Sequence, residues 1–107
     1  MIAVCVPARN ERENIERFLK TVRQANPELA IIVVDDLSPD GTGQIVEELI
    51  KSDARLSIIH RSGKKGLGAA YLAGFDRALE RGYDNVLTMD ADFSHDPAVI
   101  PALISAL

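Results

Sequence analysis

Short hydrophobic runs alternate with longer amphipathic stretches along the whole chain. Four runs rich in Val, Ile and Leu predict buried strands, at Ile2–Val6, Ala30–Val34, Leu56–His60 and Asn85–Met89. The first two runs hardly alternate between apolar and polar residues, which is typical of strands that are covered on both faces. The pattern therefore favours a parallel sheet between layers of helices.

The stretches between these runs have helical spacing. Apolar residues recur at helical intervals in three of them: Ile15, Phe18, Leu19 and Val22; Ile45, Val46, Leu49 and Ile50; and Leu72, Phe75 and Leu79. Asn26-Pro27 predicts the end of the first helix, and Gly82 predicts a C-cap after the third. A fourth helix is expected to begin at Asp96-Pro97.

The regular alternation of strand and helix predicts an α/β fold with right-handed crossovers. With 107 residues the chain is long enough for one compact domain. The sequence ends at Leu107, just as the fourth helix begins, so we expect residues 1–107 to be the N-terminal part of a larger, truncated domain.

Composition and charge narrow the function classes. The chain is 47% hydrophobic and 26% charged, as in ordinary globular proteins. Its net charge of -4 argues against a general nucleic-acid binder. No apolar run approaches the roughly 20 residues of a membrane span, and the N-terminus lacks the basic flank of a signal peptide, so the default expectation is a cytoplasmic protein. The single cysteine, Cys5, lies in an apolar run and is expected to be a buried free thiol.

Polar clusters follow every predicted strand, at Pro7–Glu11, Asp35–Gly41, Arg61–Gly68 and Asp90–Asp92. In an open parallel α/β sheet, ligands bind outside the carboxyl ends of the strands. Four clusters at one edge of the sheet therefore predict a binding site there.

The Asp90-Ala91-Asp92 triplet carries the most distinctive chemistry. In extended backbone, residues two apart point to the same side, with alpha carbons roughly 6.5 Å apart. Two carboxylates so placed repel each other unless a cation lies between them. Hard oxygen ligands suit Mg²⁺ or Mn²⁺, which would bridge a diphosphate. The alternative is a solvated loop with capping carboxylates.

Two further clusters have both a functional and a structural interpretation. Asp35 and Asp36 suit hydrogen bonding to a nucleotide base or ribose, although the following Ser-Pro-Asp-Gly is equally good turn chemistry. Lys64 and Lys65 lie in a glycine-rich stretch before a helix, which could cradle phosphate or simply be a flexible basic loop. His95 is expected to be a local hydrogen-bonding residue, and His60 carries no clear signal.

Taken together, these motifs resemble the polyprenol monophosphomannose synthases of glycosyltransferase family 2. The matching runs are Asn10–Ile15, Val33–Thr42, Gly66–Tyr71 and Met89–Pro97, in the family's order. The resemblance implies a GT-A fold, which is a Rossmann-like sheet whose second strand and metal-bearing strand flank the first. It makes the chain the nucleotide-sugar-binding part of such an enzyme.

The resemblance also implies roles for individual residues. The residues carried over to the nucleotide pocket are Pro7, Asn10 and Glu11, with Asp36 on the base or ribose, Asp35 beside it, and Lys64 and Lys65 in a basic loop near the donor. Asp90 and Asp92 match the catalytic carboxylates that bind the metal and diphosphate. Three positions depart from the family's usual pattern: Arg9, Leu37 and Ser94.

The implied reaction is inverting, metal-dependent transfer of mannose from GDP-mannose to a polyprenyl (dolichyl-type) phosphate. This acceptor needs no strong base, because a phosphate monoester with a second pKa of about 6 is already anionic at neutral pH. Membrane association is expected only through the lipid acceptor or segments beyond residue 107, at the cytoplasmic face. The 107 residues alone are expected to be inactive, because acceptor-binding residues are missing.

Two alternatives stay open at this point. One is a family 2 transferase that uses a UDP-sugar and a glycan or another lipid acceptor. The other is a receiver-like signalling domain that binds Mg²⁺. A receiver domain expects an acidic pair after its first strand, whereas here the pair Asp35-Asp36 follows the second.

Overall fold

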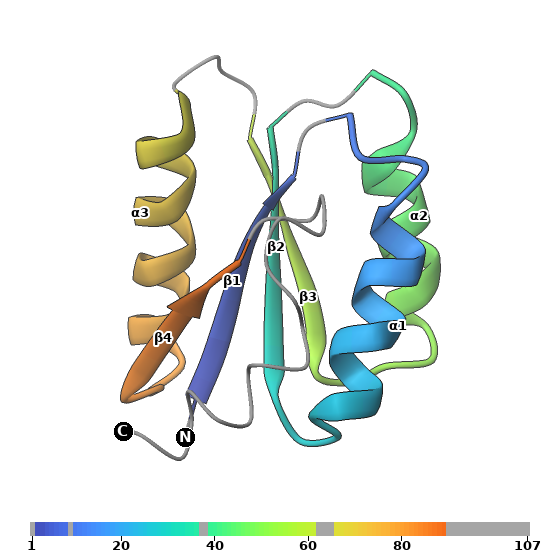
Figure 1. Ribbon diagram of the computed structural model, residues 1–107. Coiled ribbons are helices and arrows are strands. Elements are labelled where there is room, and N and C mark those ends of the chain that lie inside the picture. The colour runs from blue at the N-terminus through green and yellow to red at the C-terminus, as the bar shows by residue number, and fades with distance from the viewer. Residues whose placement is uncertain (1, 9, 37–38, 62–65, 90–107) are drawn as a thin grey trace.

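The computed structural model describes residues 2–8, 10–36, 39–61 and 66–89 (Figure 1). Strands and helices alternate in the predicted order: β1 (Ile2–Ala8), α1 (Ile15–Ala25), β2 (Ala30–Asp36), α2 (Thr42–Ile50), β3 (Leu56–Arg61), α3 (Gly66–Glu80) and β4 (Asn85–Thr88). All four predicted strands are confirmed. The predicted helix at Asp96-Pro97 lies outside the described residues.

The described strands form one parallel sheet in the order β3-β2-β1-β4. The chain therefore moves outward from β1 to β3 and then returns to the other side of β1 with β4. Helices α1 and α2 cover one face of the sheet, and α3 covers the other (Figure 1). This arrangement confirms the predicted Rossmann-like sheet, in which the second and fourth strands flank the first. The reversal at β1 is the topological switch point at which such sheets bind ligands.

The larger core lies between the sheet and the layer of α1 and α2. All four residues of the predicted α1 stripe, Ile15, Phe18, Leu19 and Val22, are buried there. They pack with inward-facing residues of β1 and β2, including Val4, Val6, Ile31 and Val33. This packing fixes α1 on the sheet, so the loop that precedes α1 is held near the carboxyl end of β1.

The predicted stripe on α3 is wrong at two of its three positions. Leu72 and Leu79 are 63% and 69% exposed. The buried face of α3 instead presents the small residues Ala70, Gly74 and Ala78 to the sheet. A Cβ at Gly74 would overlap the sulfur of Cys5, so the helix approaches β1 too closely for large side chains. Because α3 lies so close to the sheet, its buried face carries small residues and not the largest apolar ones.

Two local predictions are confirmed. Cys5 is a buried free thiol, and burial raises its pKa to about 11. Gly82 adopts left-handed backbone with φ of 79°, as a C-cap glycine does after α3. Within the described ranges, no helix is both long and apolar enough to cross a membrane.

Candidate nucleotide-binding edge

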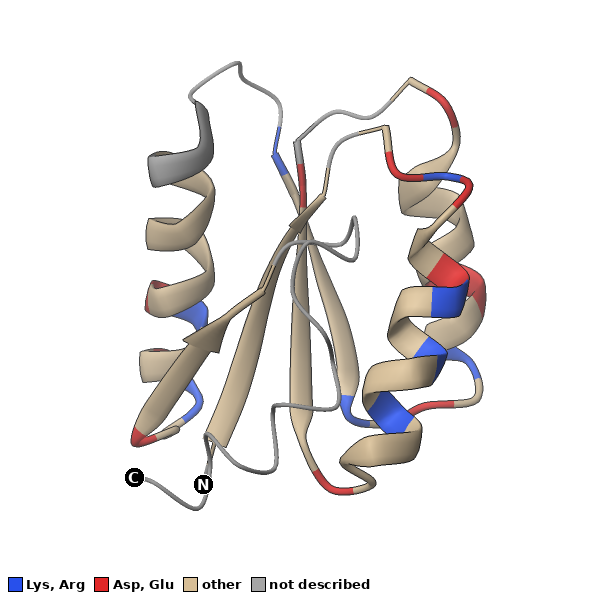
Figure 2. Ribbon diagram, viewed as in Figure 1, with Lys and Arg blue, Asp and Glu red and all other residues tan. Residues whose placement is uncertain are grey.

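The carboxyl ends of β1, β2 and β3 bring together the described residues of the first three predicted polar clusters. Ala8 of β1 is in register with Asp35 of β2, and Asp35 is in register with His60 of β3. The loops that leave this edge carry several acidic segments, whereas Lys and Arg recur along α1 (Figure 2). Residues far apart in the sequence are therefore neighbours at one edge.

Pro7 lies where β1 and β4 stop pairing. The last paired residues of these strands are Cys5 and Thr88, and one further bond joins the Met89 N–H to the Cys5 carbonyl at 3.1 Å. In a strand, the backbone groups of residues two apart point to the same side. The Pro7 nitrogen, which carries no hydrogen, therefore faces β4 as the backbone of Cys5 does. Proline is thus tolerated at the switch point, where the two strands are no longer bonded through it.

Asn10 turns the chain sharply after β1. Its φ of 55° is left-handed, and it is the one non-glycine residue with positive φ among those described. Asparagine tolerates this conformation better than most residues do. The turn directs Glu11 and Arg12 toward the loop that follows β2.

Asp40 and Thr42 join these two loops. The Glu11 N–H donates to Thr42 Oγ1 at 3.0 Å, and the Arg12 N–H donates to Asp40 Oδ2 at 3.2 Å. Within the second loop, Asp40 Oδ1 accepts bonds from the Thr42 hydroxyl at 2.5 Å and the Thr42 N–H at 3.1 Å. We call these four residues the Asp40 clip.

The hydrogen bonds of the clip also set the charge of Asp40. The Thr42 hydroxyl is the main cause of a lowered pKa at Asp40, and backbone N–H groups of Thr42 and Arg12 add to it. Donors stabilise the ionised form of a carboxyl group. Asp40 is therefore a carboxylate throughout the neutral range, and it holds the clip as an ionised acceptor.

Asp35 faces the layer of α1 and α2. His60 Nδ1 lies 3.5 Å from Asp35 Oδ2, and His60 Nε2 lies 2.7 Å from Glu47 Oε1 on α2. The Asp35 side chain is only 7% exposed. A Cβ at Gly43 would lie 2.6 Å from Asp35 Oδ2, so the first turn of α2 also closes over this carboxylate. This surrounding favours a structural contribution from Asp35 beside its predicted contact with nucleotide.

The remaining predicted residues are only partly described. Asp36 ends β2 in register with Arg61 of β3. Lys64, Lys65, Asp90 and Asp92 lie outside the described residues. In the part of the chain that the structure describes, no group of three or more His, Cys, Asp or Glu side chains could hold a metal ion.

Two features of this edge were not predicted as functional. Asp40 appears in the sequence analysis only as part of a turn, and Thr42 only as the last residue of the matching run Val33–Thr42. Their signal in the sequence is the Asp-Gly-Thr at the start of α2. His60 and Glu47 are 13 residues apart and meet only through the packing of α2 beside β3. Neither pairing has a periodic signal in the sequence.

Comparison with known proteins decides the family. The model of glycosyl transferase family 2 matches residues 3–107. The chain belongs to this family. This assignment agrees with the predicted GT-A fold and with the expectation of a glycosyltransferase.

Curated relatives place the chain more finely. It is 50% identical to a polyprenol monophosphomannose synthase of Mycolicibacterium smegmatis over 97% of the chain and 40% of the relative. It is 44% identical to an undecaprenyl-phosphate mannosyltransferase of Micrococcus luteus over 99% of the chain and 44% of the relative. The chain thus spans roughly two fifths of the length of these two family 2 relatives.

Solved structures show the same fold. A mannosyltransferase of Pyrobaculum calidifontis, solved in complex with GDP-Man and Mn²⁺, superposes with a TM-score of 0.70 at 27% identity, over 85% of this chain and 27% of that one. S. aureus TarS residues 1–349 in complex with UDP gives 0.72 at 27% identity, over the same shares of the two chains. The sheet of this chain is therefore found in proteins solved with GDP-Man and with UDP.

Proposed function

We propose that this chain is the nucleotide-sugar-binding part of a family 2 enzyme that transfers mannose from GDP-mannose to a polyprenyl phosphate. The observation that carries the proposal is the 50% identity to a polyprenol monophosphomannose synthase over 97% of the chain. The position of the described residues Asn10, Glu11 and Asp35 at the carboxyl ends of β1 and β2, beside the switch point of the sheet, supports it.

The nucleotide is proposed to lie against the loops after β1 and β2. Pro7, Asn10 and Glu11 line its pocket, and Asp36 accepts hydrogen bonds from the base or ribose. Carboxylate oxygens suit the donors of a guanine edge. Lys64 and Lys65 supply positive charge near the diphosphate.

Asp90 and Asp92 are proposed to hold Mg²⁺ or Mn²⁺ against the diphosphate. They directly follow Met89, whose N–H bonds to β1 at the switch point, which supports this placement. The ion would stabilise negative charge on the departing nucleoside diphosphate. The neighbour solved with GDP-Man and Mn²⁺ supports use of a divalent ion.

The acceptor is proposed to attack the anomeric carbon from the side opposite the leaving group, which inverts its configuration. A polyprenyl phosphate is already anionic at neutral pH and needs little help from a base. We place the enzyme at the cytoplasmic face of a membrane, held by its lipid acceptor or by segments outside these residues. The chain alone is proposed to bind nucleotide weakly without turnover.

A UDP-sugar is the second candidate donor, with a glycan or another lipid as acceptor. The TarS structure with UDP, at the same 27% identity as the GDP-Man complex, favours keeping it. The two nucleotides differ in the donors that their bases present to a carboxylate. The binding preference of the chain therefore separates the candidates.

Calorimetry of the chain with GDP, UDP and GDP-mannose tests this proposal. We expect GDP to bind more tightly than UDP, and Mn²⁺ to strengthen binding in the parent chain but not in Asp92→Ala. Glu80→Ala is the control, because Glu80 is 73% exposed on α3, and it should behave as the parent does. Equal binding of GDP and UDP would remove the mannosyl assignment. A response to Mn²⁺ that survives in Asp92→Ala would remove the metal assignment.

A further inference from the structure

The Asp40 clip joins the two loops to which the proposed function assigns the nucleotide. We propose that Asp40 and Thr42 are positioning residues that set the relative placement of these loops for nucleotide binding. They act through the backbone of Glu11 and Arg12, not by touching the nucleotide. This inference rests on the proposed function, because it assumes that the loops after β1 and β2 bind the nucleotide.

The bonds of the clip span a long distance in sequence. Thr42 and Glu11 are 31 residues apart, and Asp40 and Arg12 are 28 residues apart. Arg12 adds a third link, since its guanidinium Nη1 donates to the Asp40 carbonyl at 3.5 Å. Without these links, only the sheet and the packing of the two helices would determine how the loops meet.

The clip holds the loop before α1 mainly through its backbone N–H groups. Glu11 enters through its N–H, so its carboxylate is not consumed by the clip. The neighbouring Asn10 has left-handed backbone, a conformation that persists only where the surroundings hold it. The bond at Glu11 is one such restraint on the predicted nucleotide-binding residues.

The direction of each bond is determined by Thr42. Its hydroxyl has one proton, which it donates to the ionised Asp40, so its oxygen is left to accept from Glu11. Thr42 is fully buried, so water does not compete for its hydroxyl in the folded chain. Removal of the hydroxyl therefore breaks the link to Glu11 and leaves only the bonds between Arg12 and Asp40. Serine can keep both bonds of the hydroxyl.

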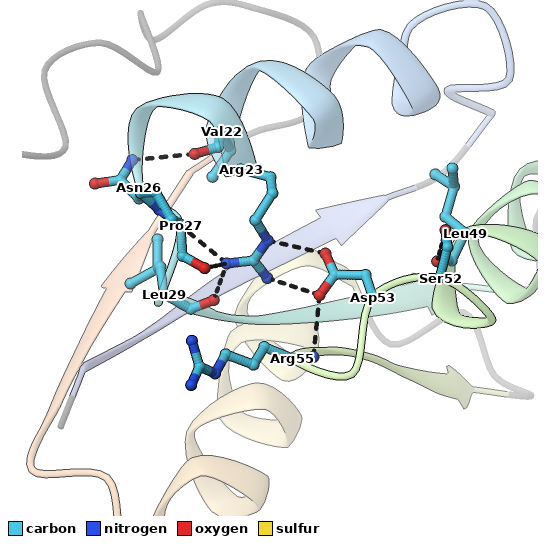
Figure 3. Close-up of polar contacts among 9 residues, drawn as sticks. All are labelled: Val22, Arg23, Asn26, Pro27, Leu29, Leu49, Ser52, Asp53 and Arg55. Carbon is cyan, nitrogen blue, oxygen red and sulfur yellow. Dashed lines mark hydrogen bonds and ion pairs between the residues drawn. The ribbon is translucent and has the colours of Figure 1, made fainter.

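The opposite edge of the sheet offers a matched control. There the Arg23 guanidinium donates to Asp53 at 2.9 and 3.2 Å, which joins the end of α1 to the loop after α2 (Figure 3). We call this the Arg23 bridge. It links the same two helices, but it lies at the amino ends of the strands, away from the proposed nucleotide. If Thr42→Val weakened GDP binding only by destabilising the fold, breaking the Arg23 bridge would weaken GDP binding as well.

The experiment compares three variants of the chain by calorimetry with GDP and by chemical unfolding. We expect Thr42→Val to weaken GDP binding about ten-fold or more. Thr42→Ser should stay within about two-fold of the parent, since about 0.4 kcal/mol corresponds to a factor of two. Asp53→Asn should lower the free energy of unfolding as Thr42→Val does, yet keep the GDP affinity of the parent.

Asp40→Asn carries the test if Thr42→Val fails to fold, because an amide nitrogen cannot accept the Arg12 N–H. Asp40 is only partly buried, so this change is milder for folding. Parent-like GDP affinity in the folded Asp40 or Thr42 variants would overturn the inference and leave the proposed function standing. An equal loss in Asp53→Asn would also overturn it. A parent chain that binds no GDP would overturn both proposals.

Discussion

Helices α1 and α2 are linked at both edges of the sheet, and the two links use different chemistry. The Arg23 bridge is built from side chains: the guanidinium binds Asp53 and also donates to the carbonyls of Asn26, Pro27 and Leu29 (Figure 3). It thus satisfies acceptors where the chain leaves α1. The Asp40 clip instead binds backbone N–H groups of the loop before α1.

The two links differ in which groups of the chain they use and in which ends of the strands they join. The Arg23 guanidinium, which binds a carboxylate and three carbonyls, orders the connection after α1 through a side chain. The Asp40 carboxylate and the Thr42 hydroxyl order the loop before α1 mainly through its backbone N–H groups, so the clip does not use the Glu11 carboxylate. The first link lies at the amino ends of the strands, and the second lies at the carboxyl ends, where ligands bind in open parallel α/β sheets.

Arg23→Ala is expected to have the largest effect on stability. It leaves the partly buried Asp53 without its partner and several carbonyls without a donor. Side-chain exposure at the pair is 21% and 23%, so solvent screens only part of this loss. We expect a decrease of about 2 kcal/mol in the free energy of unfolding, measured with urea, and unchanged GDP affinity.

Lys20→Ala is the control for that measurement. Lys20 pairs with Glu16 on the surface of α1, where both side chains are more than half exposed. Such pairs contribute less than about 0.5 kcal/mol. If Arg23→Ala lowered the free energy of unfolding no more than Lys20→Ala does, the bridge would not stabilise the amino-end edge of the sheet. The contrast between the two links would then be lost.

Acidification should weaken the Asp40 clip. The pKa of Asp40 is lowered in the folded chain from its ordinary value of 3.8, so folding favours the ionised form. Its stabilising contribution is complete above pH 3.8 and is lost as the pH falls through the lower folded pKa. Unfolding of the parent and Asp40→Asn, followed from pH 7 downward, should give two curves that converge at the acid end. Curves that stay parallel would contradict the ionised clip.

Asn10→Gly should distinguish the backbone conformation of the loop after β1 from the contribution of the Asn10 side chain. Glycine adopts φ of 55° without the cost that asparagine bears, so stability should change by less than about 1 kcal/mol. GDP binding should nevertheless weaken, because the proposed pocket loses a polar side chain. Calorimetry and urea unfolding on one preparation measure both. A variant that is as stable as the parent and binds as tightly would remove Asn10 from the pocket.

The order of strands and helices could be predicted because each buried run is short, apolar and bounded by polar residues. The predicted ends of β1 and β2 are two residues too early, because Pro7, Ala8, Asp35 and Asp36 continue the paired backbone beyond the apolar runs. On α3 the largest apolar residues were assigned to the buried face. The helix in fact packs through small residues, as Gly74 against Cys5 demonstrates.

The candidate site was predictable only in part. Its location follows from the rule that parallel strands end at one edge, and Asn10, Glu11 and Asp35 are found there. The links between loops were not predictable, because Glu11 meets Thr42 only after β1 and β2 have paired in register. Hydrogen bonds of that kind depend on tertiary structure and have no period in the sequence.

The smallest effect is expected at the pair of His60 and Glu47. It lies at the same edge as the Asp40 clip, yet both side chains are about half exposed, at 50% and 54%. Solvent screens such a pair, so Glu47→Gln should change the free energy of unfolding by less than about 0.5 kcal/mol and leave GDP affinity unaltered. Urea unfolding and calorimetry beside Thr42→Val measure the contrast. If Glu47→Gln weakened GDP binding as strongly as Thr42→Val, proximity to the edge would suffice to affect the nucleotide. The Asp40 clip would then have no special part in placing the loops.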